Sequence, residues 1–143
     1  ELQGVAEHVD AGVVSKLLAA RDGSQSSLDM LAAIVADDGV ADHIRDLAKL
    51  RLVMLDADMA LEVKESTLNA LSAPGALYRG PAIELLILHH LQNANKDIAL
   101  QIMRDQIEDA TASRGQVQRL QELTFALGET PQLANEVQTD TQN

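Results

Sequence analysis

The chain has 143 residues, which is long enough for one domain with a hydrophobic core. Hydrophobic residues make up 46% of it but aromatic residues only 1%, and this favours closely packed helices over β-sheets, which are enriched in aromatic side chains. The formal net charge of -11 argues against binding to nucleic acid or to anionic lipid, and the absence of cysteine excludes disulfides, Cys-based zinc sites and thiol chemistry.

Turn-forming residues divide the chain into segments of helical length, in which apolar side chains recur every three or four residues. These segments predict seven helices, at residues 2–21, 25–37, 41–56, 59–72, 77–92, 96–110 and 114–127. The expected helix starts are residues 24–27 before Leu28, Asn95, and Ser113 with Gln116, and the expected left-handed stops are Gly39 and Gly128. No run reaches the 18 apolar residues that a bilayer-spanning helix needs.

A shift of 35 residues superposes apolar positions that belong to different helices. The four columns are Leu47, Ala82 and Val117; Leu50, Leu85 and Leu120; Val53, Leu88 and Leu123; and Leu28, Val63 and Ile98. The shift is close to the 34-residue tetratricopeptide repeat, in which pairs of antiparallel helices bury their apolar faces by stacking. We therefore predict an all-α, tetratricopeptide-like right-handed stack in residues 1–128, with a polar, disordered tail in residues 129–143. The third and fifth helices should lie inside the stack, and the fourth and sixth outside.

Residues 27–128 resemble a bacterial family. The resemblance is carried by the strings at residues 44–51, 82–86 and 99–105 and by the turn at residues 93–97. These are similar to the tetratricopeptide-like domain of inner-membrane proteins related to the ancillary subunit of the SecYEG translocon, in the alphaproteobacterial form. The resemblance implies an N-terminal membrane anchor that is absent from this chain, a periplasmic domain, and a role in handling proteins that emerge from the translocon.

The chain departs from the general repeat consensus at two points. It lacks the large aromatic residue near the start of most repeats, keeping only Tyr78, and it has residues 93–95 where a Gly-Asp turn is usual. A peptide groove lined by aromatic or basic clamps is therefore not expected.

The adjacent residues His89 and His90 could suggest a metal site or an all-helical metal-dependent enzyme. Neighbours on a helix point about 100° apart, so two adjacent imidazoles are poorly placed to share one ion. The acidic stretches at residues 37–39 and 56–58 lack the ligand spacing of a calcium loop and are interpreted as helix stops and caps. Because the sequence also has no nucleophile elbow and no glycine-rich phosphate loop, we expect a protein that is not an enzyme and has no cofactor and no metal.

The expected function is a scaffold that binds protein partners, namely translocon subunits, periplasmic chaperones or client polypeptides. Its binding face would combine apolar contacts with a polar rim. The rim residues are His43, Asp46, Tyr78, Arg79 and His89, and the methionines that could adapt to varied clients are Met54, Met59 and Met103.

A structural homo-oligomerisation module is the alternative. In that interpretation, the stripe of the last helix formed by Val117, Leu120, Leu123 and Phe125 pairs with a second copy.

Overall fold

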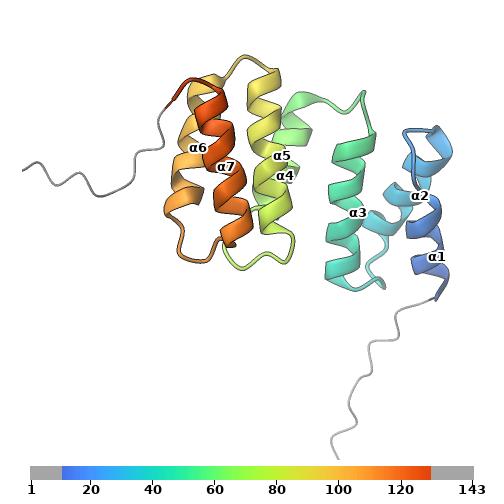
Figure 1. The fold of residues 1–143 in the computed structure, drawn as a ribbon. Helices are drawn as coiled ribbons and strands as arrows, with labels where there is room; N and C mark the ends of the chain where they lie inside the picture. The colour runs from blue at the N-terminus through green and yellow to red at the C-terminus, as the bar shows by residue number, and fades with distance from the viewer. Residues whose placement is uncertain (1–10, 130–143) are drawn as a thin grey trace, which may run out of the picture. The chain divides into compact units, whose positions relative to one another are not determined.

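The computed structural model describes residues 11–129, and its regular elements over this range are all α-helices (Figure 1). The helices are α1 (Ala11–Ala19), α2 (Gln25–Ala36), α3 (Asp42–Leu55), α4 (Leu61–Leu71), α5 (Arg79–Gln92), α6 (Lys96–Glu108) and α7 (Arg114–Ala126). The predicted helical class is thus confirmed, and each described helix end lies within two residues of its predicted place. The start of the first predicted helix and most of the predicted tail lie outside the described residues.

Helix caps explain several of these boundaries. The Ser24 hydroxyl accepts a hydrogen bond from the Ser27 backbone N–H at 3.3 Å, and the Ser113 hydroxyl accepts one from the Gln116 N–H at 3.2 Å, as predicted. Asn95 occupies the N-cap position of α6 but makes no side-chain cap.

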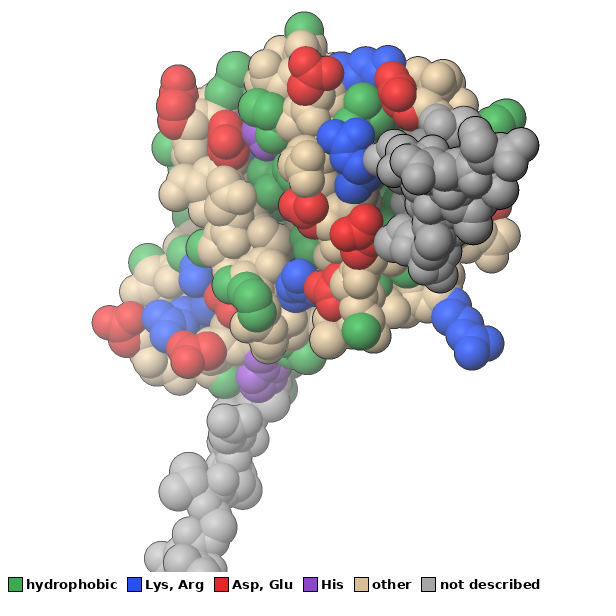
Figure 2. Space-filling view, turned by 90° about the vertical axis from the view of Figure 1, so that its left-hand side faces the viewer, with side chains coloured by type: hydrophobic (Ala, Val, Ile, Leu, Met, Phe, Trp, Pro, Cys, Tyr) green, Lys and Arg blue, Asp and Glu red, His purple; other side chains and the backbone are tan. Residues whose placement is uncertain are grey.

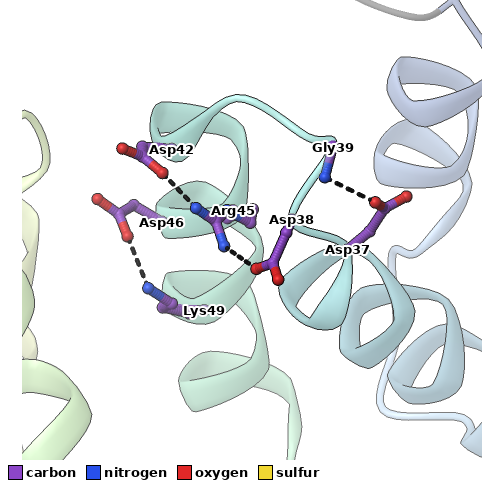
Figure 3. Close-up of polar contacts among 7 residues, drawn as sticks. All are labelled: Asp37, Asp38, Gly39, Asp42, Arg45, Asp46 and Lys49. Atoms are coloured by element: carbon purple, nitrogen blue, oxygen red, sulfur yellow. Dashed lines mark hydrogen bonds and ion pairs between the residues drawn. The ribbon is translucent and has the colours of Figure 1, made fainter.

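The two predicted glycine stops differ. Gly128 has a φ of 83° and ends α7 in the left-handed conformation that favours glycine. The prediction of a left-handed stop at Gly39 was wrong, because the φ of this glycine is not positive. Its backbone N–H instead donates to the Asp37 carboxylate at 2.9 Å, so the aspartate shapes this turn (Figure 3).

The chain divides into two compact units, Glu1–Leu85 and Leu86–Asn143, and the boundary falls within α5. In the first unit α1 packs on α2, α2 on α3, and α3 on α4. One buried cluster of this unit contains Leu17, Ala20, Leu31, Ile34 and Ala48.

The connection between α1 and α2 lies close to the C-terminal end of α3. A Cβ atom at Gly23 would lie 2.8 Å from the Leu55 carbonyl oxygen, so the close approach requires glycine. In addition, the Arg51 guanidinium donates to the carbonyl of Leu17, one of the acceptors left open near the end of α1. These contacts hold the end of α1 and the connection to α2 against α3.

In the second unit α6 packs against α7 (Figure 1). Part of their buried surface is apolar, with Met103 of α6 and Leu120 of α7 exposed by no more than 2%. Another part is polar, because the Gln106 amide Nε2 donates to Gln116 Oε1 at 3.0 Å and both side chains are buried. A buried hydrogen bond between helices favours one register, since sliding one helix would break the bond between two buried amides.

α3 has a solvent-facing side that the prediction of an inner helix did not include. Leu50 and Val53 are buried, but Met54 is 62% exposed. Within residues 11–129, no helix has the combination of length and apolar character that crossing a membrane requires.

Candidate protein-binding surface

Four of the five predicted rim residues have side chains that are partly accessible. His43 and Asp46 lie in α3, Tyr78 precedes α5, and Arg79 begins it; all four are half-buried. They therefore remain candidates for partner contact. His89 is different, because it is only 5% exposed. The prediction that His89 lies at the mouth of a binding face was wrong. Its imidazole lies in the interior, where a partner could not reach it without rearrangement.

The rings of His89 and His90 are in contact with each other. Their ring centroids are 5.3 Å apart with an interplanar angle of 69°, an edge-to-face contact, and His90 is 3% exposed. At the end of α5 the Asn93 amide donates to the His89 carbonyl oxygen at 2.7 Å. Both imidazoles are thus held inside the protein next to each other, and neither is on the surface.

A strip of alternating charges lies on α3 and the turn before it (Figure 3). The Arg45 guanidinium contacts the carboxylates of Asp38, at 3.0 Å, and Asp42, while Lys49 contacts Asp46 at 2.9 Å. The hydrogen bond that the Arg45 guanidinium donates to the Asp42 carboxylate raises the pKa of Arg45. Because each cation is paired with a neighbouring carboxylate, the strip forms a largely self-neutralised polar edge, as expected for a solvated helix face.

Large apolar side chains are exposed where α3 ends and α4 begins. Met54 is 62% exposed, Leu61 51% and Val63 53%, and we call these three residues the α3–α4 corner. The turn that joins them contributes the carboxylates of Asp56 and Asp58, and the Asp56 carboxylate accepts from the Asp58 N–H at 3.0 Å. The corner thus combines exposed apolar side chains and acidic residues in one short stretch of the chain.

A shallow groove of about 400 Å³, which we call the α4 groove, lies beside this corner. It is lined by Glu62, Glu65, Ser66 and Asn69, which all belong to α4. A second shallow groove, of about 600 Å³, lies between α1 and α2 and is lined by Lys16, Gln25, Ser26, Asp29, Met30 and Ala33. The first groove has two acidic residues in its lining, whereas the second has one charge of each sign, so only the first selects for the charge of a ligand.

Two sequence expectations about apolar binding residues are corrected. Met103 is 0% exposed and belongs to the core, whereas Met54 is accessible as expected. Leu120 is 2% exposed, so the predicted self-association stripe of α7 is largely turned into the second unit, and only Phe125, at 73%, is fully accessible. The apolar periodicity of α7 therefore describes packing inside the unit.

Figure 2 shows acidic, basic and apolar side chains interspersed over the face that it draws. Basic residues are not gathered there into one patch, in line with their scattered positions in the sequence. This face offers no broad basic area of the kind that attracts nucleic acid.

Sequence reasoning missed the α3–α4 corner as a unit. Val63 had been placed in a repeat column and Met54 among the adaptable methionines, but nothing in the helical pattern distinguished the exposed apolar residues from the buried ones. The available signal was the run from residue 54 to residue 63, in which apolar and acidic residues are interspersed around a turn.

Comparisons with known proteins give no relative from which to transfer a function. No protein-family model matches the chain, and no curated protein and no solved structure matches it either. The functional argument therefore depends on the surface itself.

Proposed function

We propose that this chain is a non-enzymatic protein-interaction scaffold that contacts its partners through the α3–α4 corner. The observation that carries the proposal is the exposure of Met54, Leu61 and Val63 within ten residues of one another. Exposed apolar side chains with polar and acidic neighbours are typical of the rim of a protein-binding site.

The size of the corner indicates what kind of binding it supports. Covering the exposed parts of three such side chains contributes about 2–4 kcal/mol. A micromolar complex requires about 8 kcal/mol, so the corner must act together with polar contacts or with additional surface. Weak, exchangeable association suits a scaffold that handles several partners.

The resemblance to inner-membrane proteins related to the ancillary translocon subunit supports a specific setting. In that setting the chain is held at the periplasmic side of a bacterial inner membrane by an N-terminal anchor. Its partners are translocon subunits, periplasmic chaperones or client polypeptides. The acidic surface and the tetratricopeptide-like repeat spacing are compatible with this role.

The chemistry of the side chains supports a binding role over a catalytic one. The hydroxyls of Ser24 and Ser113 are used as helix caps, and the imidazoles of His89 and His90 are buried. These four groups are therefore poorly available to a substrate, and we assign the chain no cofactor.

Self-association is the second candidate, and one observation favours it. Phe125 is 73% exposed on α7 and is the only phenylalanine of the chain. If copies pair through it, light scattering will show a mass that rises with concentration, and Phe125→Ser will abolish that rise. A constant monomer mass removes this candidate.

Crosslinking in living cells tests the scaffold role. A photoreactive residue is placed in the full-length protein at Val63, at His43 or at Tyr78, with Glu122 of α7 as the control position. Adducts with translocon subunits, chaperones or nascent envelope proteins at Val63, exceeding those at Glu122, support the proposal. Equal labelling at Val63 and at the control, with the same background proteins, overturns it.

A further inference from the structure

The acidic border of the α3–α4 corner indicates the chemistry of its partner. We infer that the corner and the α4 groove bind a basic amphipathic polypeptide segment, in which apolar side chains are flanked by Lys or Arg. This inference rests on the proposed function and adds to it the class of partner and its position on α4.

Charge is the first argument. Between residues 54 and 65 the chain has four carboxylates, those of Asp56, Asp58, Glu62 and Glu65, against the single ammonium of Lys64. Asp58 and Glu62 are exposed, so their field reaches solvent. This border therefore has an excess of negative charge, which attracts a cationic ligand and repels an anionic one.

Geometry is the second argument. Glu62, Ser66 and Asn69 are spaced by four and three residues, so they lie on one face of α4 over about 10 Å of helix. Leu61 and Val63 flank Glu62 at the beginning of this line. A segment lying along the groove would place a cation beside Glu62, an apolar side chain on the corner, and hydrogen-bonding groups beside Ser66 and Asn69.

The repeat spacing provides a third, independent observation. The shift of 35 residues superposes Glu62 and Val63 on Asp97 and Ile98 of α6. Ile98 is 48% exposed, close to the 53% of Val63, and Asp97 is exposed as well. The helix dipole explains why Glu62 and Asp97 occupy the first turns of their helices. It does not explain why Val63 and Ile98 are exposed, because a stacked repeat would be expected to bury a recurring apolar position. The pair therefore recurs as a surface element.

A second copy of the chain fits this surface poorly. Each copy has a net charge of -11, so pairing two acidic surfaces at the corner is opposed by repulsion. A basic segment of another polypeptide meets both the apolar and the charged requirement, and it is the occupant that the surface selects.

Fluorescence anisotropy tests the inference with three labelled synthetic peptides on the full chain. The first places leucine and lysine on opposite faces of an amphipathic helix, with leucine recurring every three or four residues. The second peptide replaces each lysine by glutamate, and the third replaces each leucine by glutamine. We expect binding of the leucine–lysine peptide only, weakened when salt rises from about 0.1 M to about 1 M, which shortens the Debye length from about 10 Å to about 3 Å.

Matched variants locate the binding site. Glu62→Lys should weaken binding about threefold to tenfold, because it replaces an attraction by a repulsion. Glu122→Lys on α7 changes the net charge by the same amount and should leave the affinity within about twofold of the unaltered chain. Val63→Ser should also weaken binding, and its control is Leu18→Ser, since Leu18 is similarly exposed at 56%. Circular dichroism establishes that each variant keeps its helices.

Two results overturn the inference. If Glu62→Lys and Glu122→Lys weaken binding equally, the peptide responds to net charge and not to the corner. If the leucine–glutamate peptide binds as well as the leucine–lysine peptide, the partner is not selected by charge. In both cases the crosslinking experiment can still find partner proteins at Val63, so the failure of this inference is distinct from a failure of the scaffold role.

Discussion

Replacing Gln106 of α6 by Met removes the donor of the hydrogen bond that joins this helix to Gln116 of α7. The two side chains are 3% and 4% exposed, and the donor and acceptor atoms are 3.0 Å apart. Methionine has nearly the length of glutamine and is flexible enough to occupy the same space, so the substitution changes polarity with little change in volume.

The expected cost follows from desolvation. With Gln106→Met alone, the Gln116 carbonyl oxygen stays buried and loses this donor, which costs about 1–3 kcal/mol of unfolding free energy. Gln116→Met has an effect of similar size on the Gln106 amide. In the double variant both polar groups are gone, and the combined cost should be well below the sum of the two single costs. We expect a coupling of at least about 1 kcal/mol between the two positions.

Urea unfolding, followed by the helical circular dichroism signal, measures the unfolding free energy of each protein in this double-mutant cycle. The dependence of unfolding free energy on urea should keep its slope in all variants, because the exposed surface on unfolding is unchanged. Additive costs, with the double variant as unstable as the two single variants together, would refute the reasoning that the buried pair sets the register of α6 and α7. Gln118→Met at an exposed position of α7 is the matched control and should change stability by no more than about 0.5 kcal/mol.

Three further predictions concern the first unit. Leu31→Ala should lower the unfolding free energy by about 2–5 kcal/mol in urea titrations, because Leu31 is 0% exposed in the core. Gly23→Ala should lower the unfolding free energy by about 1–3 kcal/mol, because the added Cβ would lie 2.8 Å from the Leu55 carbonyl oxygen. Its control is Gly115→Ala in α7, where the added Cβ meets no such contact, so the unfolding free energy should stay the same or rise by up to about 1 kcal/mol. The pKa of Asp22 is lowered from 3.8 by hydrogen bonds from two serine hydroxyls, so its carboxylate stabilises the fold at neutral pH and this contribution is lost as pH falls through the lowered pKa. Asp22→Asn should therefore lower the urea midpoint at pH 7, with the two proteins converging in strongly acidic buffer.

Several local features were predictable from sequence because they depend on neighbouring residues only. Ser24 and Ser113 cap their helices as predicted, since a hydroxyl at the N-cap reaches the N–H three residues later whatever the rest of the chain does. Gly128 takes the left-handed conformation at the end of α7 for a similarly local reason. Gly39 did not, because the Asp37 carboxylate could satisfy that turn in another way.

The candidate site was predicted only in part. Met54 was recognised as a possible contact residue, but Met103, which has the same chemistry, is fully buried. Leu120 and Phe125 lie five residues apart in one helix, and one is 2% exposed while the other is 73% exposed. Residue type and spacing do not determine exposure, which depends on what the neighbouring helices cover.

The sequence by itself determined the helical class, the places where helices begin and end, and the acidic character of the chain. Hydrophobic periodicity, capping residues and charge act over a few residues, so they can be recognised without knowing the fold. Tertiary structure alone decided that His89 is buried, that Gln106 and Gln116 pair across two helices, and that Met54, Leu61 and Val63 are exposed. These features depend on which helix faces pack together, and each such face is chosen by contacts between residues distant in sequence.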